Sequence, residues 1–132
     1  MGALFEFLVP FALLPLWPRL VVGAVLVVAG VLLIRASMRA IDDAGTTYDP
    51  YAPSTALVTV GIYRYTRNPG YLGLAVIVVG IAIVFDSVWI VLADGLAILV
   101  TTRFVIQLEE EKLSRCFGQP YDDYVARVRR WI

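Results

Sequence analysis

The sequence predicts an all-α, polytopic integral membrane protein with about four hydrophobic helices and a C-terminal amphipathic helix at the membrane interface. Of its 132 residues, 60% are hydrophobic, and a mean hydropathy of +0.79 is too high for a soluble domain of this size. The hydrophobic residues form four runs, at about 3–17, 20–34, 70–85 and 87–100. Most charges lie in a central loop and a C-terminal tail, a distribution that is typical of bilayer proteins.

The first part of this single domain (1–132), residues 1–41, is expected to hold two membrane helices. The run at 20–34, with its flanking residues, reaches the length of about 20 residues that a span requires. The run at 3–17 is shorter and contains Pro10 and Pro15. It is either a short tilted span or a membrane-embedded half helix, and we favour a span.

Residues 42–68 form a polar, turn-rich loop that is longer than an ordinary connection, so we expect it to contribute to a site. A helical hairpin is expected over 69–113, because only Asp86 and Ser87 separate its two apolar runs. The tail, 114–132, has Pro120 where a helix would begin, with apolar residues at helical spacing and arginines among them. This pattern predicts a helix at the membrane interface.

Glycines repeat at a spacing of seven residues in two of the predicted helices. Gly23 and Gly30 form one pair, and Gly73 and Gly80 form the other. Small residues on one helix face allow two backbones to approach closely. We therefore expect these glycines to pack helices together and to have no catalytic role.

Basic residues are distributed very unevenly about the predicted spans. Only Arg19 lies on one side. The other ten of the eleven lie on the opposite side: Arg35, Arg39, Arg64, Arg67, Arg103, Lys112, Arg115, Arg127, Arg129 and Arg130. By the positive-inside rule, the loop 42–68 and the C-terminus are expected to be cytoplasmic.

The composition also argues against several functions. The net charge is zero and no basic block interleaves with aromatic residues, so nucleic acid is not an expected partner. The chain has no histidine and a single cysteine, Cys116, which excludes an internal disulfide, histidine metal sites and Ser-His or Cys-His catalytic pairs.

Polar residues at the end of the last apolar run follow helical spacing. Arg103, Gln107, Glu110 and Ser114 are expected on one face, with Glu109 beside it. A solvated helix end with ordinary ion pairs and a functional site are both consistent with this spacing. Arg127 and Arg130 are expected to contact lipid headgroups, and the tyrosines of the tail to pack or to lie at the interface.

Four segments decide between these alternatives: LVTVGIYRYTRNPGYLG, then EEEKL, then FGQPYDDY and finally VRRW, over residues 57–131. In this order and spacing they resemble the isoprenylcysteine carboxyl methyltransferase and phospholipid methyltransferase superfamily of integral membrane enzymes. The resemblance implies methyl transfer from S-adenosylmethionine to a lipophilic or membrane-embedded acceptor. Residues 1–54 match only as generic membrane helices.

The resemblance also implies a cofactor pocket at the cytoplasmic membrane face. Matched position by position, the pocket would be formed by Tyr63, Arg64, Arg67, Asn68, Pro69, Tyr71, Leu72, Glu109 and Glu110. Of these, Arg67, Asn68 and Glu110 are the residues expected to act in catalysis.

The chemistry of S-adenosylmethionine agrees with these residue types. Its ammonium and sulfonium favour carboxylates and aromatic faces, and its carboxylate suits Arg67 or the helix N-terminus that Pro69 would begin. Asn68 stands where many relatives have histidine, and an amide cannot shuttle a proton at neutral pH. We therefore expect transfer to depend mainly on positioning of the reacting groups.

Two alternatives remain open. A sterol-reductase-like enzyme would use NADPH, but the chain is short for that class. A small four-helix transporter could use Glu6 as a membrane-embedded carboxylate, but the long polar loop and tail are unusual for one.

Overall fold

The computed structural model describes residues 14–46 and 57–132, and within them every regular element is helical. The elements are α2 (Leu16–Asp43), a 3₁₀-helix η1 (Gly61–Arg64), α3 (Pro69–Val84), α4 (Val88–Thr101), a π-helix η2 (Thr102–Ile106), α5 (Gln107–Phe117) and α6 (Gln119–Arg127). The prediction of an all-α fold is confirmed. The expected first span, at 3–17, lies almost entirely outside the described residues.

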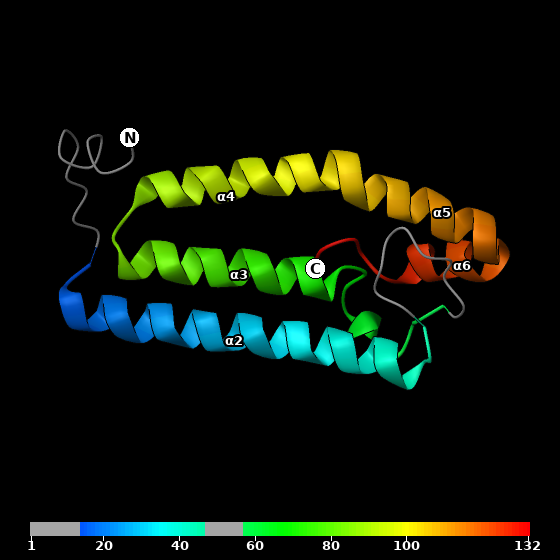
Figure 1. The fold of residues 1–132 in the computed structure, drawn as a ribbon, viewed down its shortest axis with the longest axis horizontal. Coiled ribbons are helices and arrows are strands. Elements are labelled where there is room, and N and C mark those ends of the chain that lie inside the picture. The colour runs from blue at the N-terminus through cyan, green and yellow to red at the C-terminus, as the bar shows by residue number, and fades with distance from the viewer. Residues whose placement is uncertain (1–13, 47–56) are drawn as a thin grey trace.

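Helices α2, α3 and α4 run side by side as a row, and α5 and α6 lie at one end (Figure 1). Among the described residues, two helices are long and apolar enough to cross a membrane: α2, of 28 residues, and the continuous helix Val88–Phe117, of 30 residues. Between them, α3 is apolar but shorter, with 16 residues. The outer faces of the long helices expose large hydrophobic side chains, as expected for surfaces that face lipid.

Helices α2 and α3 pack against each other through the two glycine pairs. A Cβ atom on Gly73 would lie 2.6 Å from the carbonyl oxygen of Gly30, and one on Gly80 would lie 2.8 Å from that of Gly23. Both distances are shorter than real Cβ contacts, so the helices can approach this closely only at glycine. The predicted packing role of these residues is confirmed.

A tight turn joins α3 to α4 at the end of the molecule that lies away from α6 (Figure 1). Asp86 has φ of +53° there, and Ser87 caps α4 by accepting a hydrogen bond from the amide of Ile90. The guanidinium of Arg19, on α2, lies 3.3 Å from the carboxylate of Asp86. This ion pair ties α2 to the turn of the hairpin.

The π-helix η2 separates α4 from α5 and changes the direction in which the following side chains point. A π-turn holds more residues than an α-turn, so α-helical spacing cannot be carried across it. The prediction that Arg103 shares a face with Glu110 is therefore wrong: Arg103 lies within η2 and is exposed. Gln107, Glu110 and Ser114 all lie in α5 and keep their common face.

The chain reverses between α5 and α6 at Gly118, whose φ of +61° and ψ of −128° are accessible to glycine but strained for other residues. Helix α6 then packs back on the protein through Tyr121 and Tyr124, and Val128 follows immediately after the helix. All three side chains are buried. The packing role expected for the two tyrosines is confirmed, and this part of the apolar face of α6 is covered by protein.

Candidate functional site

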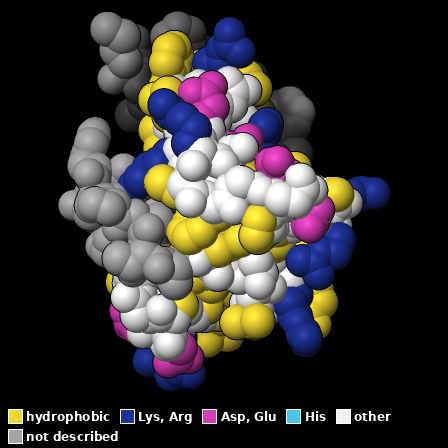
Figure 2. All heavy atoms as spheres, turned by 90° about the vertical axis from the view of Figure 1, so that its right-hand side faces the viewer, with side chains coloured by type: hydrophobic (Ala, Val, Ile, Leu, Met, Phe, Trp, Pro, Cys, Tyr) yellow, Lys and Arg dark blue, Asp and Glu magenta, His cyan; other side chains and the backbone are white. Residues whose placement is uncertain are grey.

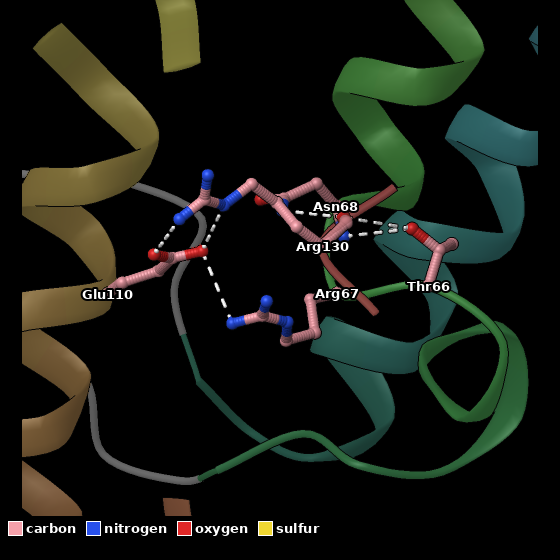
Figure 3. Close-up of polar contacts among 5 residues, drawn as sticks. All are labelled: Thr66, Arg67, Asn68, Glu110 and Arg130. Carbon is pink, nitrogen blue, oxygen red and sulfur yellow. Dashed lines mark hydrogen bonds and ion pairs between the residues drawn. The ribbon is translucent and has the colours of Figure 1, made fainter. Parts of the chain in front are cut away.

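A cluster of polar side chains lies where the start of α3, the first turn of α5 and the end of the chain meet (Figure 3). Pro69 is the first residue of α3, as its sequence position predicts, and Asn68 precedes the helix. A proline suits this position because its ring fixes φ at a helical value. The N–H group that proline lacks would have no partner within the helix at this position. The loop residues before α3 are thus held in a defined position beside its N-terminus.

Glu110 is the centre of the cluster. The guanidinium of Arg130 donates from Nε to Oε1 at 2.8 Å and from Nη2 to Oε2 at 2.9 Å. Nη1 of Arg67 lies 3.3 Å from Oε1. The side chain of Arg130 is thus paired with Glu110 and is 34% exposed, and its expected contact with lipid headgroups stays a prediction. Two arginines share one carboxylate, so the three side chains carry a net positive charge.

The tail is joined to the loop by three further hydrogen bonds. The backbone carbonyl of Arg130 accepts from Nδ2 of Asn68 at 2.9 Å and from Oγ1 of Thr66 at 3.3 Å. The amide of Arg67 donates to the carbonyl of Arg129 at 3.0 Å. Residues far apart in sequence are thereby brought together, and the side-chain amide of Asn68 is used to hold the tail.

Glu109 and Tyr71 form a second contact between α5 and α3. The hydroxyl of Tyr71 donates to Oε1 of Glu109 at 3.1 Å. Both residues are partly buried. Glu109 and Glu110 are thus each bonded to the segment around the start of α3, as the resemblance implies for a common pocket.

Arg67 has an unpaired donor inside this cluster. Its side chain is only 13% exposed, and its Nε is buried with no hydrogen-bond partner among the described residues. A buried guanidinium N–H without an acceptor is costly and is rare in native proteins. An anionic ligand that supplies an acceptor would remove this cost.

The tyrosines beneath the cluster are held neutral by their surroundings. Burial raises the pKa of Tyr124 well above its ordinary value, and burial followed by the charge of Glu110 raises the pKa of Tyr121. The hydroxyl of Tyr124 donates to the carbonyl of Tyr63 at 2.7 Å. Hydrogen bonding to Glu110 raises the pKa of Arg130, so that guanidinium remains charged.

Three of the residues implied by the resemblance lie outside the Glu110 cluster. Tyr63 packs on the buried tyrosines of α6, and its hydroxyl is 2.9 Å from Oγ of Ser37 on α2. Leu72 is in the first turn of α3, and its amide bonds to the carbonyl of Asn68. Arg64 is exposed at the end of η1.

The comparisons with known proteins agree with the sequence pattern. The family model described as phospholipid methyltransferase matches residues 18–120. The chain is 31% identical over 112 residues to a protein-S-isoprenylcysteine O-methyltransferase of Dictyostelium discoideum, covering 81% of this chain and 46% of that protein. It is 30% identical over 115 residues to a probable protein-S-isoprenylcysteine O-methyltransferase of Oryza sativa subsp. indica, covering 81% and 57%.

A third relative is the nickel-cobalt-cadmium resistance protein NccN of Alcaligenes xylosoxydans xylosoxydans, 36% identical over 75 residues that cover 57% of this chain and 35% of that protein. The chain spans about half the length of the isoprenylcysteine methyltransferases that it matches. No solved structure matches it significantly. Residues 14–46 and 57–132 contain no group of three or more acidic or cysteine side chains that could hold a metal ion.

Proposed function

Because the chain belongs to the phospholipid methyltransferase family, we propose that it transfers the methyl group of S-adenosylmethionine to a lipophilic acceptor at the cytoplasmic face of a membrane. The observation that carries this proposal is the polar cluster around Glu110. It joins the start of α3, the first turn of α5 and the tail, the segments in which the sequence resembles membrane methyltransferases.

The residues of the cluster suit the charged groups of the cofactor. Arg67 has a buried, unpaired Nε that could donate to the methionine carboxylate. Glu109 offers a carboxylate to an ammonium or a sulfonium, Glu110 holds the guanidinium of Arg67 in place, and the ring of Tyr71 offers an aromatic face. We propose that these residues, with Asn68 and Pro69 at the start of α3, form the cofactor pocket.

The cofactor supplies an electrophilic methyl group when it is bound. The chain would contribute position and charge, because in-line transfer requires the acceptor atom and the methyl group to be held together. Asn68 donates to the carbonyl of Arg130 and so positions the tail, whereas proton transfer by an amide is not feasible at neutral pH. The proposed mechanism therefore needs an acceptor whose reacting atom is already a nucleophile, such as a carboxylate or thiolate.

A lipophilic acceptor is supported by the location of the cluster. It lies beyond the apolar parts of α2, α3 and α4, at the end of the molecule that holds η1, α5 and α6 (Figures 1 and 3). The relatives are described as acting on isoprenylcysteine or on phospholipid, and both classes carry long apolar chains. An acceptor of this kind could remain in the bilayer while its polar end reaches the cluster.

Calorimetric titration of the detergent-purified protein tests the proposal. S-adenosylmethionine and S-adenosylhomocysteine should bind, while NADPH and lipophilic cations should not. Binding of NADPH alone would indicate a reductase, and binding of the lipophilic cations alone would indicate a transporter. Transfer of a labelled methyl group to a prenylcysteine or to a phospholipid in nanodiscs would then identify the acceptor class.

A further inference from the structure

A cavity lies between the segment that leads into η1 and helix α6. It has a volume of about 310 Å³. Its lining consists of Thr59, Val60, Arg64, Tyr124, Arg127 and Val128. Of the residues that the resemblance implies for the cofactor pocket, only Arg64 is among them, and none of the residues of the Glu110 cluster lines this cavity.

Both charged residues of the cavity are arginines. Arg64 and Arg127 are exposed, and neither forms an ion pair with an acidic side chain in the described part of the chain. Arg127 donates from Nε only to the carbonyl of Asp123, one turn earlier in its own helix. The two guanidiniums therefore line the cavity without a direct acidic partner among the described residues.

The elements that carry these arginines are held in place. Arg64 ends η1, in which Tyr63 is bonded through its hydroxyl to Ser37 and through its carbonyl to Tyr124. Arg127 ends α6, which is fixed by the burial of Tyr124. The two arginines are thus presented to one cavity from two elements that are bonded to each other, whereas arginines on a freely moving tail would not share a fixed site.

The remaining lining is suited to an amphiphile. The hydroxyl of Thr59 can donate to an anion, and the side chains of Val60 and Val128 form an apolar wall. Val60 is 61% exposed, so its side chain is accessible to a ligand in the cavity. Basic and acidic side chains are interspersed over this end of the molecule (Figure 2), so the unpaired arginines of the cavity are a local feature.

We propose that this cavity binds the phosphate of a membrane phospholipid headgroup, with Arg64 and Arg127 as its ligands. The planar fork of a guanidinium matches phosphate oxygens in pairs, and two such forks favour a doubly coordinated phosphate over a carboxylate. The glycerol end of the lipid would lie along Val60. This assignment gives Arg64 a role apart from the cofactor, and it does not depend on methyl transfer.

Native mass spectrometry of the delipidated protein tests this site with phosphatidylglycerol as the probe. Dioleoylglycerol, which lacks the phosphate, serves as the comparison lipid. The test variant is Arg64→Gln/Arg127→Gln. The matched control is Arg115→Gln, because Arg115 is also exposed and also donates from Nε to a carbonyl one turn earlier, at the same 3.4 Å, but does not line the cavity.

We expect phosphatidylglycerol to bind the double variant at least about 10-fold more weakly than the wild type, because the variant loses the charged hydrogen bonds from both guanidiniums to the phosphate. The Arg115→Gln variant should retain wild-type affinity, and dioleoylglycerol should bind all three proteins equally weakly. Equal affinity of phosphatidylglycerol for the double variant and the Arg115→Gln control would overturn the site. Displacement of the lipid by millimolar inorganic phosphate would overturn the lipid assignment in favour of free phosphate.

Discussion

Arg130 holds Glu110 in a two-point contact, with Nε and Nη2 of one guanidinium bonded to the two oxygens of one carboxylate at 2.8 and 2.9 Å. Twenty residues separate the two in sequence, and α6 lies between them. Because the carbonyl of Arg130 is also bonded to Asn68, this residue connects α5 with the start of α3. The end of the chain thus becomes part of the candidate site.

Arg130→Lys keeps the charge but loses the fork, so the tail should be held less firmly. The amide of Arg67 donates to the carbonyl of Arg129 and should exchange its hydrogen about 5 to 10 times faster in the variant. This factor corresponds to a decrease of about 1 to 1.5 kcal/mol in the free energy of local opening. Hydrogen exchange with peptide resolution measures this. Arg129→Lys is the matched control, since only the backbone of Arg129 takes part; equal rates in the two variants would show that the fork does not hold the tail.

Gly73→Ala should destabilise the α2–α3 pair. Its Cβ would lie 2.6 Å from the carbonyl oxygen of Gly30, so the helices would have to separate, at a cost of about 1 to 3 kcal/mol. A thermal melt in detergent would show a lower Tm. Gly95→Ala is the control: a Cβ there meets nothing within 4 Å, and alanine should stabilise α4 by about 0.5 to 1 kcal/mol. A similar Tm for both variants would contradict the glycine contact.

Alkaline pH should destabilise the protein through Tyr124. Its pKa is raised by burial in the folded state, so above pH 10 the unfolded chain loses a proton that the folded protein retains. The stabilisation is complete below the ordinary pKa of about 10 and is lost as the pH rises further.

Thermal melts from pH 8 to pH 11 in Tyr124→Phe measure this contribution. The variant should have a lower Tm at pH 8, because the carbonyl of Tyr63 loses a donor, and a shallower decline above pH 10. Tyr65→Phe is the control, because it removes a hydroxyl from a side chain that is 72% exposed. Its Tm should fall above pH 10 as steeply as that of the wild type. Parallel declines in all three proteins would rule out a contribution of Tyr124.

The C-terminus should be cytoplasmic and the α3–α4 turn should lie on the opposite side of the membrane. Ten of the eleven basic residues lie on the side of the loop and tail, and only Arg19 is placed with Asp86 at the other end. A reporter fused after Ile132 and one inserted at Asp86 measure this in cells. Activity of a periplasmic or luminal reporter at the C-terminus would contradict the orientation.

Much of the fold could be predicted from the sequence, because apolar runs, glycine spacing and Pro69 act locally. The π-helix could not be predicted from residue spacing, since nothing in Thr102–Ile106 distinguishes a π-turn from an α-turn, and Arg103 was placed on the wrong face for this reason.

The pairing of Arg130 with Glu110 depends on the reversal of the chain at Gly118 and on the packing of α6, which are properties of the whole tertiary structure. An arginine near an aromatic residue in a basic tail is equally typical of a lipid contact, so residue types alone do not favour an internal partner. The four segments of the resemblance did contain a signal, because VRRW includes Arg130 and EEEKL includes Glu110.

The most direct test of the account is the affinity of S-adenosylhomocysteine for Glu110→Gln, measured by calorimetry in detergent. This change removes the charge that Arg67 and Arg130 share while keeping the size of the side chain. If the cluster is the cofactor pocket, the dissociation constant should rise about 10- to 100-fold, the scale of one charged hydrogen bond. Glu111→Gln, on the exposed side of the same helix, should bind as the wild type does. Equal affinity in Glu110→Gln and Glu111→Gln would contradict the account.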